Sequence, residues 1–253
     1  MSEGSRPRLR LDDVAQGTTG HVELRFPRGE EDRAEAAAAL VEVLEPVVAR
    51  YLGAPWQGGV RLELLAEARA GGANPVTGTL RHALRGFDER SPRSAGALSY
   101  ELGRILLYRS THEDAYPGAS PRNPDWLEEA ALLPLRYVWE DRDSWVEAVA
   151  EKVALFRWRK PFPEALLRDM SRLNARQRVV ASAQCLLRSQ SLTSAHPDWV
   201  RVWRSRLAGD RRLDGERALE QVSGSSMDRW EARFAEDLAG AVATLGSAPP
   251  REW

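Results

Sequence analysis

The sequence contains little cysteine, lysine or histidine, and it has no long apolar run. Its single cysteine, Cys185, excludes an intrachain disulfide and a zinc site built from several cysteines. No segment approaches the roughly 20 apolar residues of a membrane span, and the N-terminus lacks the apolar core of a signal peptide. We therefore expect a soluble protein of the reducing cytoplasm, with no membrane partner.

The sequence also lacks an excess of charge of either sign. Its 253 residues include 36 basic and 37 acidic side chains, which gives a formal net charge of −1. Arginine and aromatic residues are interleaved at 157–160 and at 201–212, but acidic residues alternate with them on the expected helix surfaces. Without a net positive field we expect no nucleic-acid partner. The composition, 43% hydrophobic and 8% aromatic, is typical of an ordinary globular protein.

The hydrophobic pattern changes from one half of the chain to the other. Residues 21–26 alternate between apolar and polar side chains, as a half-buried strand does, and similar patterns recur at 60–64 and 77–84. Between the first two, the residues from Glu30 to Leu52 have helical spacing, and Gly53 is expected to end that helix. Beyond Tyr137 every pattern is helical, with expected helices starting at about residues 143, 163, 175, 199, 218 and 227.

This order predicts an α+β fold, in which a small N-terminal β-sheet with helices is followed by a mostly α-helical C-terminal half. Residues 1–20 are polar and glycine-containing, and we expect a flexible lead-in there. We expect residues 21–245 to form a single domain, with an α/β half at 21–109 and a helical half at 110–245. Residues 246–253 are expected to form a tail.

Two helices with carboxylates lie where the halves meet. The first carries Glu101, Arg104 and Tyr108 on a face away from its apolar side, and Tyr100 directly precedes Glu101. An exposed loop from Arg109 to Asn123 follows, and the second helix is expected to open at Pro124 with Asn123 as its N-cap. The second helix carries three further residues of interest, namely Trp126, Glu128 and Glu129.

This pair of motifs resembles the core of the gluzincin metallopeptidases, which include thermolysin-like enzymes. In that family a His-Glu-x-x-His helix supplies two zinc ligands and a general base, and a Trp-Leu-x-Glu helix supplies the third ligand. Here Tyr100 and Arg104 stand at the two histidine positions, whereas Glu101 and Glu129 keep the positions of the base and the third ligand. A guanidinium has no free lone pair for zinc, and a phenol is a poor substitute for imidazole.

The resemblance therefore implies a gluzincin fold that has lost its zinc, with no catalytic residue and no cofactor expected. Two buried glutamates without a metal would leave like charges together. We predict that Arg104 replaces the metal electrostatically by pairing with Glu129 and with Glu101, and that the Tyr100 hydroxyl closes the network. A tyrosine that stabilises the oxyanion in active members has no counterpart in residues 176–182.

Three functions are compatible with this degenerate site. The first is an inactive protein that binds a peptide or protein partner through the former substrate cleft, with Trp126 and His112 as candidate cleft residues. The second is a divergent metal-dependent peptidase or hydrolase in which Glu101 and Glu129 act with a non-standard ligand such as His112, around Mg²⁺ or Mn²⁺. The third is a purely structural subunit.

Overall fold

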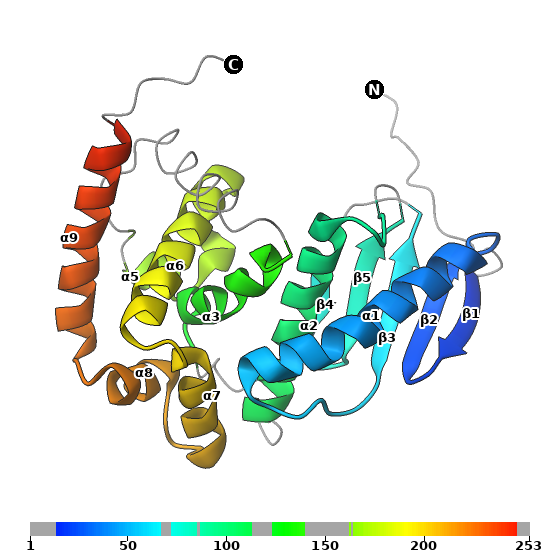
Figure 1. The fold of residues 1–253 in the computed structure, drawn as a ribbon, viewed down its shortest axis with the longest axis horizontal. Helices are drawn as coiled ribbons and strands as arrows, with labels where there is room; N and C mark the ends of the chain where they lie inside the picture. Colours follow the sequence, from blue (N-terminus) through cyan, green and yellow to red (C-terminus); the bar gives the residue numbers. More distant parts are fainter. Residues whose placement is uncertain are drawn as a thin grey trace, which may run out of the picture.

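A computed structural model describes residues 14–66, 72–84, 87–112, 123–139, 162 and 164–246. A small mixed β-sheet covered by two helices lies beside a half made of helices, so the predicted α+β fold class is confirmed (Figure 1). The strands are β1 (Val14–Thr19), β2 (Val22–Pro27), β3 (Val60–Leu65), β4 (Gly72–Asn74) and β5 (Thr79–Ala83). Their order in the sheet is β1-β2-β3-β5-β4, with β2, β3 and β5 parallel and both edge strands antiparallel to their neighbours.

The first edge strand corrects the expectation of a flexible lead-in at residues 1–20. Residues 14–19 form β1, which pairs with β2 over its whole length, from Val14 opposite Pro27 to Thr19 opposite Val22. The segment lacks a clear apolar alternation, so its structure comes from backbone pairing across the Gly20 turn, where φ is 56°. The short strand β4 was also not predicted, since three residues are too few for a periodic pattern.

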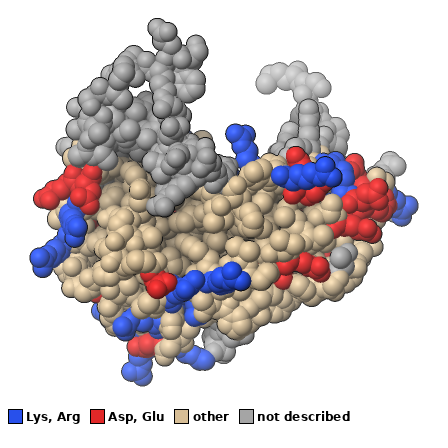
Figure 2. Space-filling view, in the orientation of Figure 1, with Lys and Arg blue, Asp and Glu red and all other residues tan. Residues whose placement is uncertain are grey.

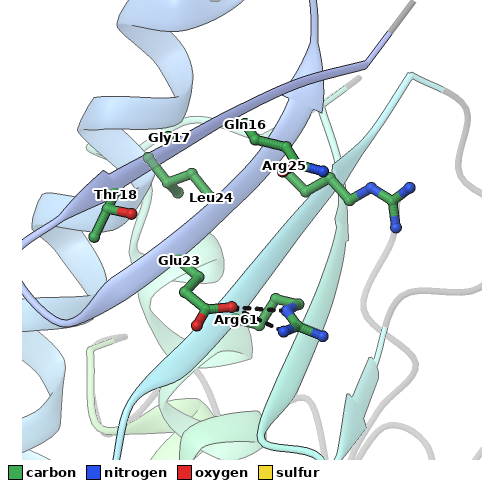
Figure 3. A pocket seen from close by; sticks show the side chains of 7 residues that line it. All are labelled: Gln16, Gly17, Thr18, Glu23, Leu24, Arg25 and Arg61. Atoms are coloured by element: carbon green, nitrogen blue, oxygen red, sulfur yellow. Dashed lines mark hydrogen bonds and ion pairs between the residues drawn. The ribbon is translucent and has the colours of Figure 1, made fainter. Parts of the chain in front are cut away.

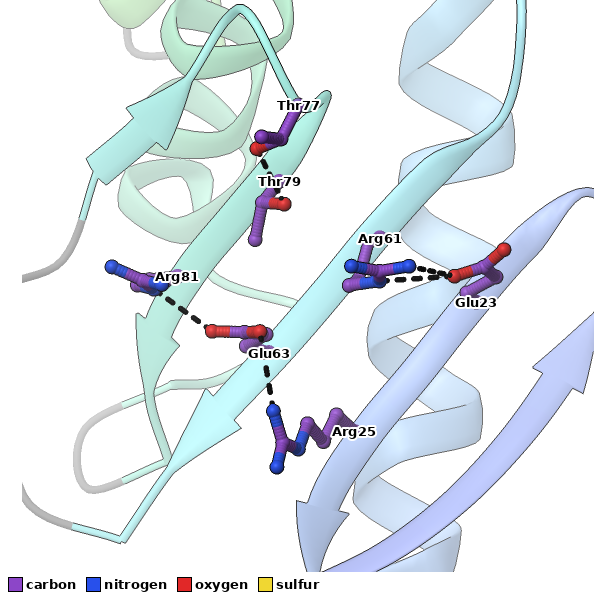
Figure 4. A network of polar contacts seen from close by, with 7 residues as sticks. All are labelled: Glu23, Arg25, Arg61, Glu63, Thr77, Thr79 and Arg81. Atoms are coloured by element: carbon purple, nitrogen blue, oxygen red, sulfur yellow. Dashed lines mark hydrogen bonds and ion pairs between the residues drawn. The ribbon is translucent and has the colours of Figure 1, made fainter.

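The two faces of the sheet differ in chemistry. One face is apolar and buried, and its side chains include Val22, Leu24, Phe26, Val60, Leu62, Leu64 and Leu80. The other face carries a ladder of charges across neighbouring strands (Figure 4): Glu23 pairs with Arg61, and Glu63 lies between Arg25 and Arg81. The alternation of the sequence predicts this division, because successive strand residues point to opposite faces.

Helices α1 (Glu31–Leu52) and α2 (Pro92–His112) cover the apolar face of the sheet (Figure 1). Gly53 ends α1 in the left-handed conformation, with φ of 63°, as the sequence predicts. Helix α2 packs against α1 on one side and against the helical half on the other, where it contacts α3 and α7. Helix α1 also contacts α7, so both helices join the two halves.

The helical half consists of α3 (Asp125–Tyr137), α5 (Glu164–Leu167), the short 3-10 helix η2 (Met170–Arg172), α6 (Ala175–Ala195), α7 (Trp199–Gly209), α8 (Gly215–Ser223) and α9 (Met227–Gly246). The helix expected from residue 163 is instead divided between α5 and η2, where the Asp169 side chain caps η2. The helix expected from residue 143 lies outside the described residues, as does the tail from 247 on.

One face of the molecule carries charges of both signs. On the face shown in Figure 2, basic and acidic side chains lie next to one another and do not gather into a patch of one sign. Within the described ranges, no helix combines the length and the apolarity that crossing a membrane requires.

Candidate functional site

Close packing of α2 on α3 brings the two sequence motifs together. A Cβ atom at Gly96 would overlap the backbone carbonyl of Arg136, and one at Gly103 would lie 2.7 Å from Leu135 Cδ1. At Gly96 only glycine permits the two helix backbones to approach this closely, whereas at Gly103 the leucine side chains would have to shift. The two glycines are seven residues apart and so share one face of α2, a spacing that the sequence displays but that sequence analysis overlooked.

The contact at the centre of the site joins Tyr100 on α2 to Glu129 on α3. The Tyr100 hydroxyl donates a hydrogen bond to Glu129 Oε1 over 2.5 Å, as expected for a hydroxyl that closes the network. Tyr100 is 9% exposed, and burial together with the neighbouring Glu129 charge raises the pKa of its hydroxyl. Burial also raises the pKa of Glu129, although the bond from Tyr100 lowers it. The pair is thus a short hydrogen bond in a largely dry place, and it is charge-assisted when Glu129 is ionised.

Glu101 faces the edge strand β4. The backbone N–H of Ala73 donates to Glu101 Oε2 over 2.8 Å, and Arg104 Nη1 lies 3.8 Å from the same oxygen. Burial raises the pKa of Glu101, an effect that the Arg104 charge and the Ala73 N–H partly offset. The carboxylate is therefore already engaged by the edge of the sheet.

Arg104 does not take the position expected for a replacement of the metal. Its side chain is 40% exposed, and among the residues that the structure describes its ion pair is the long one to Glu101, not one to Glu129. The charges of Glu101 and Glu129 still act on it through space. Because an exposed pair contributes only about 0–1 kcal/mol, the tyrosine and not the arginine is the main partner of the buried carboxylate.

A second buried carboxylate, Glu128, adjoins this network. Asn123 Nδ2 donates to Glu128 Oε1 over 3.0 Å, and burial raises the pKa of Glu128. Asn123 is almost fully buried, so its side chain binds the carboxylate and does not cap α3, which begins after Pro124. The sequence motif had suggested no function for Glu128.

The structure corrects one candidate cleft residue, Trp126, and the expected start of the loop that was to hold the other, His112. Trp126 is 1% exposed and stacks on Trp230 with 5.7 Å between ring centroids, so it belongs to the core and lines no cleft. His112 was placed in a loop, but α2 continues through it. It follows Glu101 by eleven residues on this helix, which separates their backbones by about 16 Å at the helical rise of about 1.5 Å per residue.

The side chains at the four motif positions do not fit a zinc ion. Arg104 has no lone pair to give, and the Tyr100 hydroxyl is occupied as a donor to Glu129. Within the described ranges, no group of three or more histidine, cysteine, aspartate or glutamate side chains could hold a metal ion. The arrangement can hold protons and accept hydrogen bonds, but it does not supply the ligand set that activates a water molecule.

A shallow pocket of about 580 Å³ lies elsewhere, on the charged face of the sheet beside β1 (Figure 3). Its lining residues are Gln16, Gly17, Thr18, Glu23, Leu24, Arg25 and Arg61. The charges of Glu23 and Arg61 satisfy each other at 2.9 Å, and both side chains are more than half exposed. All three charged side chains of this pocket are therefore already in ion pairs.

Comparison with protein-family models and with curated proteins finds no match to this chain.

Proposed function

We propose that this chain is a catalytically inactive protein on the gluzincin fold, and that it binds an extended peptide segment of a partner protein beside Glu101. The proposal is carried by one observation: the protein's own groups engage both carboxylates of the motif, through Tyr100 to Glu129 and through Ala73 to Glu101. In a metallopeptidase these carboxylates would serve the metal and the attacking water.

The edge of β4 supports the peptide-binding part of the proposal. Ala73 directs its N–H away from β5 and towards Glu101, and β4 ends the sheet. Because the N–H and C=O of a strand residue point to the same side, the Ala73 carbonyl also faces outwards. An extended peptide could add to this edge, bonding to the carbonyl and displacing Glu101 from the N–H.

The relationship to the gluzincins is tested by restoring the two lost ligands. Tyr100→His/Arg104→His would place two imidazoles one turn apart on α2, with Glu129 opposite the first. We expect this variant to bind about one zinc ion per chain by elemental analysis, whereas the wild type binds none stoichiometrically. Adding Glu129→Gln should abolish the gained zinc. A double-histidine variant that folds but takes up no zinc would refute the proposed geometry.

Peptide binding is tested at Ala73. Ala73→Pro removes the outward N–H at an edge position where proline is tolerated, and Ala73→Gly keeps the N–H as the matched control. Peptides selected against the wild type from a random library should bind Ala73→Gly nearly as well, but Ala73→Pro about tenfold more weakly. Equal binding by Ala73→Pro would exclude the β4 edge. If no peptide can be selected, a purely structural role is favoured.

A further inference from the structure

A second pocket, remote from Glu101, lies between α6, α9 and the turn that joins α8 to α9. Its volume is about 270 Å³, and the buried Trp230 forms part of its wall. Its polar lining comes from three separate parts of the helical half, and we call it the serine–arginine pocket after these residues: Ser191, His196, Ser223, Ser225, Arg229 and Arg233.

The polar side chains that line the serine–arginine pocket are hydrogen-bond donors that are either neutral or positively charged. The lining contains no carboxylate. Arg229 and Arg233 are one turn apart on α9, so two like charges lie on the same face of this helix. Neither forms an ion pair within the described residues, whereas Arg188 and Arg217 nearby pair with Glu231 and Asp214. Two adjacent guanidinium groups beside the hydroxyls of Ser191 and Ser225 favour an anion.

The α8–α9 turn adds to this polarity. Gly224 adopts the left-handed conformation with φ of 65°, which turns the chain between Ser223 and Ser225. Helix α9 begins directly after this turn, at Met227, and runs for 20 residues. The Met227 N–H at the start of α9 already donates to Glu220 Oε1 over 2.8 Å, and Ser223 Oγ donates to the Ser225 carbonyl over 3.3 Å. The turn therefore contributes the Ser225 hydroxyl, and not the N-terminus of α9, to the pocket.

An apolar pocket of about 400 Å³ adjoins the first and shares Ser191, Ala195 and Arg233 with it. Its apolar lining includes Leu187, Phe234 and Leu238. Asp237 also lines it, so an anionic group is less favoured here than in the serine–arginine pocket. Together the two pockets have the size of an ordinary small-molecule site, in which an apolar part accompanies a few polar groups.

We infer that the two pockets together bind a small organic phosphate monoester. The phosphoryl group would occupy the serine–arginine pocket, and the apolar group would lie against Phe234 and Leu238. A phosphoryl group suits this lining because its terminal oxygens accept hydrogen bonds in several directions, from the two guanidinium groups and from the serine hydroxyls. A carboxylate has only two oxygens, which a single arginine satisfies. This inference does not depend on the proposed function.

The inference is tested by isothermal titration of the full chain with three probes: phenyl phosphate, inorganic phosphate and benzyl alcohol. Phenyl phosphate should bind in one-to-one stoichiometry and more tightly than either of the other probes. Its affinity should fall as salt is added, because the interaction is ionic and partly exposed. The inference is overturned if phenyl phosphate does not bind, or if it binds no better than inorganic phosphate.

Variants locate the binding. Arg229→Gln and Arg233→Gln should each weaken phenyl phosphate binding by about tenfold or more. Ser191→Asp, which adds a carboxylate to the lining, should remove measurable binding. Arg28→Gln, which removes an exposed charge on the sheet half, is the matched control. The three pocket residues are exposed or half-exposed, so these variants should fold. Equal loss in the control, or retained binding by Ser191→Asp, would disprove the location.

Discussion

Tyr100→Phe is the sharpest perturbation of the network between α2 and α3. It removes one oxygen atom and leaves the ring in its place against α3. The deleted hydroxyl is the donor that reaches Glu129 Oε1 over 2.5 Å. Without it Glu129 stays buried and loses the hydrogen bond that lowers its pKa.

The expected cost follows from the charge of the acceptor. A hydrogen bond to a charged group contributes about 1.5–3 kcal/mol to stability, whereas one between neutral groups contributes about 1 kcal/mol. Tyr51→Phe is the comparison for a neutral acceptor. The Tyr51 hydroxyl donates to the backbone carbonyl of Ala131, which lies on α3 as Glu129 does, over 2.7 Å. We expect Tyr100→Phe to cost about twice as much as Tyr51→Phe at neutral pH.

The difference in stability cost between Tyr100→Phe and Tyr51→Phe should depend on pH. The pKa of Glu129 is raised above its ordinary value of 4.5, so below that value the carboxyl is protonated in both the folded and the unfolded chain. At about pH 4 the bond from Tyr100 is then one between neutral groups, and the two variants should cost nearly the same.

Urea unfolding followed by circular dichroism, at neutral pH and at about pH 4, measures these free energies. A typical domain has about 5–15 kcal/mol of stability, so both variants should remain folded. Equal costs for the two variants at neutral pH, or a Tyr100→Phe cost that does not change with pH, would refute the assignment of a charged Glu129 held by Tyr100.

Three further predictions concern residues of the same two helices and of α6. Glu129→Gln should raise the free energy of unfolding near neutral pH and change it little at about pH 4. Burial raises the pKa of this carboxyl, so its ionisation costs stability as pH rises above 4.5. Destabilisation by Glu129→Gln at neutral pH would contradict this prediction. Arg188→Ala, which breaks a buried ion pair, should lower the free energy of unfolding by about 3–5 kcal/mol, but Arg104→Ala by only about 0–1 kcal/mol. Similar losses for the two variants in urea melts would show that Arg104 holds the site together. Gly96→Ala should lower the melting temperature by several degrees, since its Cβ would overlap the Arg136 carbonyl, and an unchanged melting temperature would mean that α2 and α3 can separate without cost.

The periodic elements were predictable from the sequence because burial imposes a period on side chains. The alternation at residues 21–26 and 60–64 agrees with β2 and β3, and Gly53 ends α1 as expected. The non-periodic strands β1 and β4 were missed, because pairing with a neighbour and not amphipathicity stabilises them. Helix α2 ends later in the chain than the apolar pattern predicts. Its last turn is polar, but it continues the helix that the preceding apolar face defines.

The sequence by itself determined the chemical character of the motif site. Replacement of two histidines by Tyr100 and Arg104 removes zinc ligands wherever the side chains lie, since the donor atoms of a side chain depend on its identity alone. It also determined that two carboxylates, Glu101 and Glu129, stand on neighbouring helices.

Only the tertiary structure decided which group donates a hydrogen bond to each carboxylate. The short, rigid Tyr100 side chain is directed at Glu129 because two glycines let α2 and α3 approach closely, whereas the longer Arg104 side chain extends partly into solvent. The serine–arginine pocket likewise combines residues from α6, the α8–α9 turn and α9, which no sequence spacing relates. Contacts between distant segments depend on how helices pack, and a local pattern of residues carries no record of that packing.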